Sequence, residues 1–361
     1  MGKASRRQDG HQAEKAPCTP SNAESGEKEP RKGSWVPFIT WLFVLAVALI
    51  YRFVDERQIS KRELPLSRDL FIVSYPKSGN FWVRFLLAHT WLYSQPGESN
   101  WHREIDFNSI ERTIPDLEYG PNRRDYHLHD KFRAFKSHQP FAPKAVAGKC
   151  ADTVGTMDDH QCACPNCPPK WRRILHLVRD GRDVMCSYYH FRMGLNNLDP
   201  PDMGFEEFLK AHLLFRYPSI FPHQADTYPG FTWAEHVNSY LDLKGNSSYD
   251  VLTVKYEDLH RAPLETLVEV SKWAGLDHSE KILQRAIVRS SFKSMRRKEE
   301  ARGLLIFDEK YPDRDKSWRM TRKGKAGGWE ECFSSPASKD IFNELAYDTL
   351  FGLGYVQDER W

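Results

Sequence analysis

Four apolar segments of strand length alternate with helical patterns along most of this chain, and this alternation limits the folds that it can adopt. The apolar segments are 70–74, 132–137, 174–179 and 251–256. The helical patterns are 82–92, 205–215 and 263–275. Strands that alternate with helices are typical of a parallel sheet with helices on both faces. The pattern therefore predicts one α/β domain, over 69–361, with a central parallel sheet flanked by helices.

The N-terminal region differs in composition from the rest of the 361-residue chain. Residues 1–34 are rich in Lys, Glu, Gly, Ser and Pro, which predicts a disordered tail. The segment 35–54 begins with a long uncharged run and is long enough to span a hydrocarbon core of about 30 Å. We interpret 35–54 as one transmembrane helix and 55–68 as a stem. The alternatives are a buried core helix and a cleaved signal peptide.

Two features favour a lumenal position for the residues after this helix. Lys and Arg occur on both of its sides, so the distribution of positive charge does not decide the orientation. Asn246 begins an Asn-Ser-Ser triplet, an N-glycosylation pattern, and an even number of cysteines follows the helix. We therefore expect a type II membrane glycoprotein.

The net charge of the whole chain, +3, is too small to indicate a nucleic-acid partner.

The segment 74–82, SYPKSGNFW, joins the first predicted strand to the first predicted helix. Gly79 permits a tight turn, and Ser78 or Asn80 is expected to cap the helix. Free backbone N–H groups and the helix dipole favour an anion at such a turn, and Lys77 adds a positive charge. The segment therefore predicts a P-loop-like site for a phosphate or sulfate group, although it lacks the second Gly of an ATP-type P-loop.

A second strand–turn–helix segment, 177–191, repeats this design. Arg179 ends the strand, and Ser187 follows across the turn, so the two side chains can hold a second anion. A basic, glycine-rich segment further along is expected to close over the same anion through Arg322, Lys323 and Gly324. Two anion pockets on one sheet indicate a nucleotide with phosphates at both ends.

Together these segments resemble the sulfotransferases that use 3′-phosphoadenosine 5′-phosphosulfate (PAPS), with the layout of the cytosolic-type family. The matching segments occur in the family's order and are Tyr75–Trp82, Lys136–Pro140, Arg179 with Ser187, Tyr256–Asp258, Ser290–Phe292 and Arg322–Gly324. The resemblance implies transfer of a sulfuryl group from PAPS to an acceptor hydroxyl, on a glycan or a small molecule, without a metal. The membrane anchor is more like that of Golgi carbohydrate sulfotransferases, so we expect the Golgi.

The resemblance also implies roles for individual residues. His138 is expected to be the general base, and Lys77 to neutralise charge on the departing nucleotide. Lys136 lies two residues before His138 on a strand, hence on the same face, and is expected to hold the sulfuryl group. The expected nucleotide-binding residues are Lys77, Ser78, Gly79, Asn80, Phe81 and Trp82; Arg179 and Ser187 at the 3′-phosphate; Tyr256, Ser290 and Phe292, which with Trp82 surround the adenine; and Arg322, Lys323 and Gly324.

The chain departs from the family pattern at several positions. Asn80 and Phe81 replace two threonines, and the family's dimerisation motif is not recognisable, so the oligomeric state stays open. A P-loop-type kinase is the alternative enzyme, but it needs an acidic Mg²⁺ ligand that the sequence does not clearly place. An inactive binding protein with this fold is a further alternative, against which the intact Lys77, His138 and Arg179 argue.

A cysteine-rich segment, 150–170, lies between the second and third predicted strands. It is longer than the corresponding connection of the family and looks like an insertion. Its cysteines are Cys150, Cys162, Cys164 and Cys167. In an oxidising lumen they are expected to form two disulfides, for which three pairings are possible. A tetrahedral zinc site and a loop of free thiols are the alternatives.

Overall fold

The computed structural model describes residues 69–117, 132–141, 172–195, 202–211, 231–305, 308, 311–312, 314–315 and 317–361. All of them belong to one compact unit, Glu56–Trp361. The predicted tail, transmembrane helix, stem and cysteine-rich insertion lie outside the described residues. Within the described part of the chain, no helix combines the length and apolar character that a membrane span requires.

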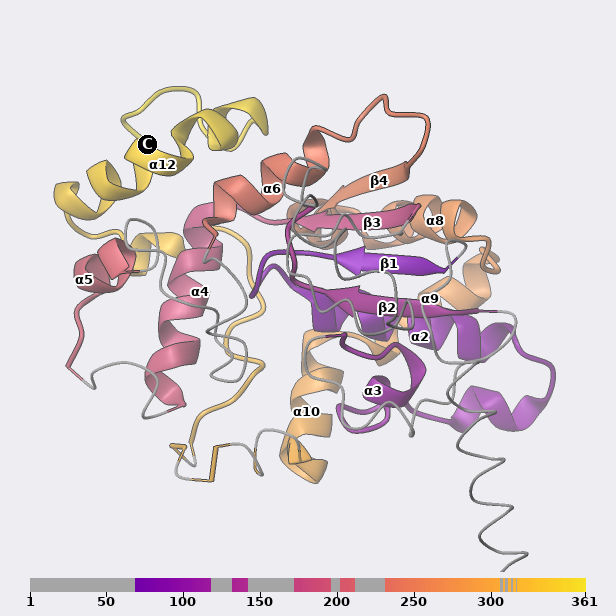
Figure 1. The fold of residues 1–361 in the computed structure, drawn as a ribbon. Helices are drawn as coiled ribbons and strands as arrows, with labels where there is room; N and C mark the ends of the chain where they lie inside the picture. The colour runs from indigo at the N-terminus through magenta and orange to yellow at the C-terminus, as the bar shows by residue number, and fades with distance from the viewer. Residues whose placement is uncertain are drawn as a thin grey trace, which may run out of the picture. The chain divides into compact units, whose positions relative to one another are not determined.

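The sheet has four parallel strands in the order β2-β1-β3-β4 (Figure 1). The strands are β1 (Leu70–Val73), β2 (Ala134–Ser137), β3 (Arg173–Val178) and β4 (Asp250–Lys255). They lie within two residues of the predicted apolar segments. The predicted α/β fold with a central parallel sheet is therefore confirmed.

Helices cover both faces of the sheet. Alternate strand residues point to opposite sides, so each strand packs against helices on both faces. Leu70 and Ile72 belong to the larger core cluster, which also contains residues of the helices α2 (Asn80–Ser94), α8 (Pro263–Ala274) and α9 (Glu280–Arg289). Phe71 and Val73 face the other way and pack with Tyr240 of α6 (Trp233–Leu241). All four of these strand residues are almost completely buried. This two-sided burial explains why β1 is a continuous apolar run rather than an alternating one.

The helices follow the strands in the order that the sequence predicts. Their bounds are α2 (Asn80–Ser94), η1 (Glu98–His102), α3 (Ile110–Thr113), α4 (Gly181–Gly194), α5 (Phe205–Leu209), α6 (Trp233–Leu241), α7 (Tyr256–Arg261), α8 (Pro263–Ala274), α9 (Glu280–Arg289), α10 (Phe292–Arg302), η6 (Trp329–Glu331) and α12 (Pro336–Gly352). Gly275 ends α8 in the left-handed conformation at φ 71°, as its position in the sequence predicts. Figure 1 shows that α4 and α5 lie beyond the carboxyl ends of the strands.

Candidate active site

A cavity with a volume of about 570 Å³ lies at the carboxyl ends of the strands, the usual place for a ligand in a parallel α/β sheet. Each strand is followed, within four residues of its end, by a residue that lines the cavity: Lys77 after β1, His138 after β2, Arg179 after β3 and Tyr256 after β4. Of the residues predicted from the sequence, the cavity is lined by Lys77, Gly79, Asn80, Phe81, Trp82, His138, Arg179, Ser187, Tyr256, Phe292, Arg322, Lys323 and Gly324. Ser78, Lys136 and Ser290 do not line it.

The turn between β1 and α2 forms one end of the cavity. Gly79 is the N-cap of α2 at φ 103°, and an added Cβ would lie 2.6 Å from the Tyr256 ring, so only glycine fits. Among the residues that the structure describes, no side chain caps the helix, so the expected cap by Ser78 or Asn80 was wrong. Asn80 is already helical, and its amide is directed to His138 instead. The first turn therefore keeps the character of an anion site.

The side chain of Lys77 enters the same end of the cavity. Its Nζ lies 3.2 Å from Met320 Sδ and 4.2 Å from the centroid of the Phe191 ring. Burial lowers the pKa of Lys77 to about 7, Glu299 opposes this shift, and Arg179 reinforces it. Lys77 also has a left-handed backbone with φ 69°, a strained conformation for a non-glycine residue. An anion bound beside Lys77 would stabilise its charged form.

His138 follows β2 and is oriented by backbone and side-chain contacts. Its Nδ1 lies 2.6 Å from the Ser74 carbonyl oxygen, and its Nε2 lies 3.4 Å from the Asn80 amide nitrogen. A carbonyl oxygen only accepts hydrogen bonds, so Nδ1 carries the proton and Nε2 the lone pair. Burial, reinforced by the charge of Lys136, lowers the pKa of His138 well below its ordinary value. The imidazole is therefore neutral at physiological pH.

Two of the predicted residues lie behind the cavity wall. The ammonium of Lys136 pairs with the Asp116 carboxylate at 2.7 Å, and Asp116 lines the cavity in its place. The Ser290 hydroxyl is completely buried and lies 3.0 Å from Nδ1 of His89. From these positions Lys136 affects the cavity through Asp116 and His138, and Ser290 does not present its hydroxyl to a ligand there.

The other end of the cavity carries four positive or hydroxyl-bearing side chains. Arg179 and Ser187 line it together with Arg322 and Lys323, as the sequence predicts. The guanidinium of Arg179 donates to the Lys325 carbonyl at 2.8 Å and pairs with Asp183 at 3.4 Å. The side chains of Arg322 and Lys323 both pair with the Glu331 carboxylate, Arg322 at 2.7 Å. Glu331 thus competes with an anionic ligand for the positive charges of Arg322 and Lys323.

The sequence model of the protein family described as "Sulfotransferase domain" matches residues 167–350, which is about half of the chain. The chain belongs to the sulfotransferase family. An amine sulfotransferase of Oryctolagus cuniculus is 23% identical over 80% of this sulfotransferase and 84% of its own length. Sulfotransferase 2A6 of Mus musculus is 24% identical over 79% and 85% of the two chains.

Solved sulfotransferase structures share the fold. Mouse sulfotransferase SULT7A1 complexed with PAP matches with a TM-score of 0.51 and 20% identity over 79% of this sulfotransferase and 84% of that chain. Retinol dehydratase in a complex with retinol and PAP matches with a TM-score of 0.51 and 19% identity over 80% and 82%. At these identities the likeness concerns the fold.

Two aromatic side chains of this sulfotransferase stand on the cavity wall where a flat base is expected. Trp82 packs edge-on against Tyr256, with ring centroids 5.4 Å apart. Phe292 lies against Gly324, where an added Cβ would come within 2.2 Å of its ring. Gly324 is thus needed both for its positive φ of 60° and for this close approach. That the two rings enclose an adenine stays a prediction.

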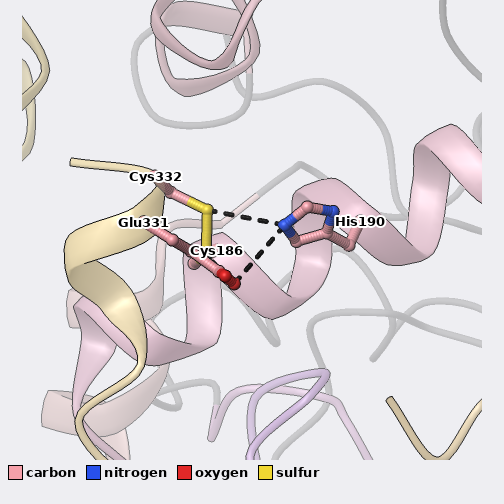
Figure 2. A group of neighbouring side chains, drawn as sticks. All are labelled: Cys186, His190, Glu331 and Cys332. Atoms are coloured by element: carbon pink, nitrogen blue, oxygen red, sulfur yellow. Dashed lines mark hydrogen bonds and ion pairs between the residues drawn. A yellow bond between two sulfur atoms is a disulfide. The ribbon is translucent and has the colours of Figure 1, made fainter. Parts of the chain in front are cut away.

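A group of side chains that no sequence motif indicates lies beside the basic end of the cavity. Cys186 of α4 and Cys332, after η6, form a disulfide between positions 146 residues apart, and His190 and Glu331 lie next to it (Figure 2). The even number of cysteines after residue 54 was the only available signal. It could not show which two residues meet, because nothing local in the sequence relates α4 to η6.

Proposed function

We propose that this sulfotransferase transfers the sulfuryl group of PAPS to a hydroxyl of a small-molecule acceptor, with His138 as the general base. One observation carries the proposal: the lone-pair nitrogen of a neutral histidine lies beside the uncapped, lysine-bearing turn of an anion site. A base and an anion site in one cavity are what transfer to a hydroxyl requires. The PAP complexes of structures with this fold support the choice of donor.

The donor fits the two ends of the cavity. The turn at Lys77 and Gly79 would hold the 5′-phosphosulfate, and Arg179 and Ser187, together with the basic segment at Arg322, would hold the 3′-phosphate. PAPS supplies an activated sulfuryl group whose transfer leaves a nucleotide phosphate. The charged form of Lys77 would stabilise the negative charge that grows on this leaving group. Positioning and charge stabilisation dominate such in-line displacements.

His138 would remove the proton of the attacking hydroxyl. The Ser74 carbonyl fixes the ring so that Nε2 is the proton acceptor, and the Asn80 amide, which now donates to Nε2, marks the place of the incoming hydroxyl. A low pKa keeps Nε2 unprotonated before each turnover. The imidazolium formed afterwards would return its proton to solvent or product.

The described acceptor end of the cavity favours a molecule with an apolar body. Phe107, Met295 and Leu304 line it together with Phe81, and two carboxylates, Glu111 and Asp116, are also on the wall. Retinol, bound in one of the similar structures, has an apolar body and a hydroxyl. A glycan acceptor is the competing possibility, which the test includes.

The decisive experiment is turnover of the purified chain with ³⁵S-labelled PAPS and a mixed panel of hydroxyl, amine and glycan acceptors. We expect label on an apolar alcohol or phenol, no loss of activity with EDTA, and no transfer from ATP. Transfer to glycans alone would contradict the proposed acceptor class. Transfer of phosphate from Mg-ATP would indicate the kinase alternative.

We also propose a single-pass Golgi protein with a lumenal domain, anchored through 35–54. Asn246 supports this, because it is exposed in the turn before β4, where its Oδ1 accepts a hydrogen bond from the Ser248 N–H at 3.0 Å. The Cys186–Cys332 disulfide suits an oxidising compartment. In animal cells the protein should shift in mobility after glycosidase treatment, and Asn246→Gln should abolish the shift. Digestion of the domain by protease added outside sealed vesicles would contradict this topology.

A further inference from the structure

Four side chains from two separate segments converge beside the basic end of the cavity. Cys186 and His190 lie one turn apart on α4, hence on one face of the helix, and Glu331 and Cys332 are adjacent at the end of η6. Figure 2 shows the imidazole of His190 directed toward both Cys332 and Glu331. One donor atom from each of the four residues lies within 4.8 Å of the others.

Three spacings between these atoms match those of ligands around one metal ion, whereas the two sulfurs are bonded to each other and must first separate. Zinc bonds of about 2.0–2.3 Å in a tetrahedral site place neighbouring ligand atoms about 3.3–3.8 Å apart. His190 Nε2 lies 3.7 Å from Cys332 Sγ and 3.5 Å from Glu331 Oε1, and Cys186 Sγ lies 3.4 Å from the same oxygen. Two sulfurs, an imidazole and a carboxylate are ligands that zinc prefers.

The geometry points to a redox-dependent zinc site formed by Cys186, His190, Glu331 and Cys332, which binds one Zn²⁺ only when the disulfide is reduced. A thiol or phosphine reductant supplies two electrons, the S–S bond breaks, and the sulfurs take up two protons as thiols. Binding of Zn²⁺ then releases these protons and leaves two thiolates as ligands. In the oxidised form the sulfurs are bonded to each other, and the site offers only an imidazole and a carboxylate.

The surroundings of the cluster suit this exchange. The side chains of His190 and Glu331 are 39% and 31% exposed, so an ion and a reductant can reach them. His190 Nε2 already faces Cys332 Sγ and Glu331 Oε1, so the ring needs no reorientation to contribute a ligand atom.

The zinc site itself does not rest on the proposed function, but its consequence for the donor does. Glu331 holds Arg322 and Lys323 in the oxidised form. A carboxylate that moves onto the metal releases these two cations toward the cavity, where they are expected to bind the 3′-phosphate. Cys186 also lines the cavity, next to Ser187. Reduction with zinc should therefore tighten the binding of PAP severalfold.

The test uses the full chain with Cys18, Cys150, Cys162, Cys164 and Cys167 replaced by serine, so that only Cys186 and Cys332 remain. The protein is reduced with a phosphine or kept oxidised, equilibrated with Zn²⁺ and desalted, and zinc per chain is measured. We expect about one zinc per reduced chain and almost none per oxidised chain. Co²⁺ in the reduced chain should give the absorption of a tetrahedral thiolate site. Equal zinc in both forms, or no zinc in either, would overturn the proposal.

Matched variants assign the ligands. His190→Ala and Glu331→Gln should weaken zinc binding at least about tenfold. The controls are His278→Ala and Glu330→Gln, which change exposed residues of the same types outside the cluster and should leave zinc binding unchanged. If the serine-substituted chain does not fold, the unsubstituted chain is compared with Cys332→Ser after reduction. The variant should then hold one zinc fewer per chain, and equal zinc would overturn the site. PAP affinity that is equal in the oxidised and the zinc-loaded form would overturn the coupling to the donor site.

Discussion

Nδ1 of His138 lies 2.6 Å from the carbonyl oxygen of Ser74, at the end of the neighbouring strand β1. This contact between two parallel strands fixes the tautomer, because the carbonyl can only accept. The base nitrogen, Nε2, is thereby directed to the turn that carries Lys77 and Asn80. A backbone carbonyl cannot be replaced by mutation, so the consequences of this contact have to be tested at His138 itself.

His138→Asn should lower kcat at least about 10²-fold, the usual contribution of acid–base assistance. The Asn amide can still donate toward the Ser74 carbonyl, but it supplies no base. PAP affinity should stay close to that of the unchanged chain, measured by calorimetry. His278→Ala, far from the strand ends in sequence and exposed, serves as the control for removal of a histidine. Near-normal turnover of His138→Asn would refute the assignment of the base.

The acid limb of the pH profile should lie at unusually low pH. Burial lowers the pKa of His138 below the ordinary value of about 6.5, so the base stays neutral, and kcat/KM stays high, until the pH falls through that lowered pKa. The measurement is kcat/KM for the acceptor from pH 4.5 to 7. An acid limb centred at or above pH 6.5 would show that the ring is solvated or lies elsewhere.

PAP affinity should decrease as the pH rises above 7. The pKa of Lys77 is about 7 in the free protein, and a bound anion raises it. The favourable charge is therefore fully present below pH 7 and is lost progressively up to the pKa of the complex, by at most about tenfold per pH unit. Titration calorimetry between pH 7 and 9 checks this slope. Lys77→Met should bind more weakly and without the slope, and a slope that persists in this variant would assign it to another group.

Arg179→Ala should weaken binding of PAP by about 10- to 100-fold, the scale of a lost charge-assisted hydrogen bond pair. Binding of adenosine 5′-phosphate, which lacks the 3′-phosphate, should change much less. The PAP affinity of Arg179→Lys should lie between those of the unchanged chain and Arg179→Ala, since lysine keeps the positive charge but cannot donate two parallel hydrogen bonds as the guanidinium does. Arg179 also donates to the carbonyls of Lys77 and Lys325. Equal losses for both nucleotides would mean that it acts through these contacts instead.

Glu331→Gln should increase PAP affinity in the oxidised protein. The carboxylate pairs with Arg322 and Lys323, and its removal frees both cations for the ligand. The pairs are partly exposed, so the gain is at most about fivefold, equivalent to about 1 kcal/mol. Glu330→Gln, on the neighbouring exposed residue, is the matched control. Weaker binding by Glu331→Gln would show that the carboxylate positions the basic segment rather than competing with the ligand.

The sheet and most of the cavity wall can be predicted from local sequence patterns. Strands buried on both faces must be apolar throughout, so the segments around Leu70 and Ile174 could be recognised from composition alone. The carboxyl ends of parallel strands meet at one edge, so polar residues that follow different strands, such as Lys77 and Arg179, had to gather there.

The directions of individual side chains, in contrast, depend on packing between distant segments. Alternation along a strand placed Lys136 and His138 on one face, but β2 ends at Ser137, and beyond that residue the loop sets the direction. Lys136, which lies inside β2, pairs with Asp116, a contact between separate segments that no local pattern contains. Cys186 and Cys332 likewise meet because α4 packs against η6. Local propensity fixes elements and their ends, whereas contacts between distant segments depend on how the whole core packs.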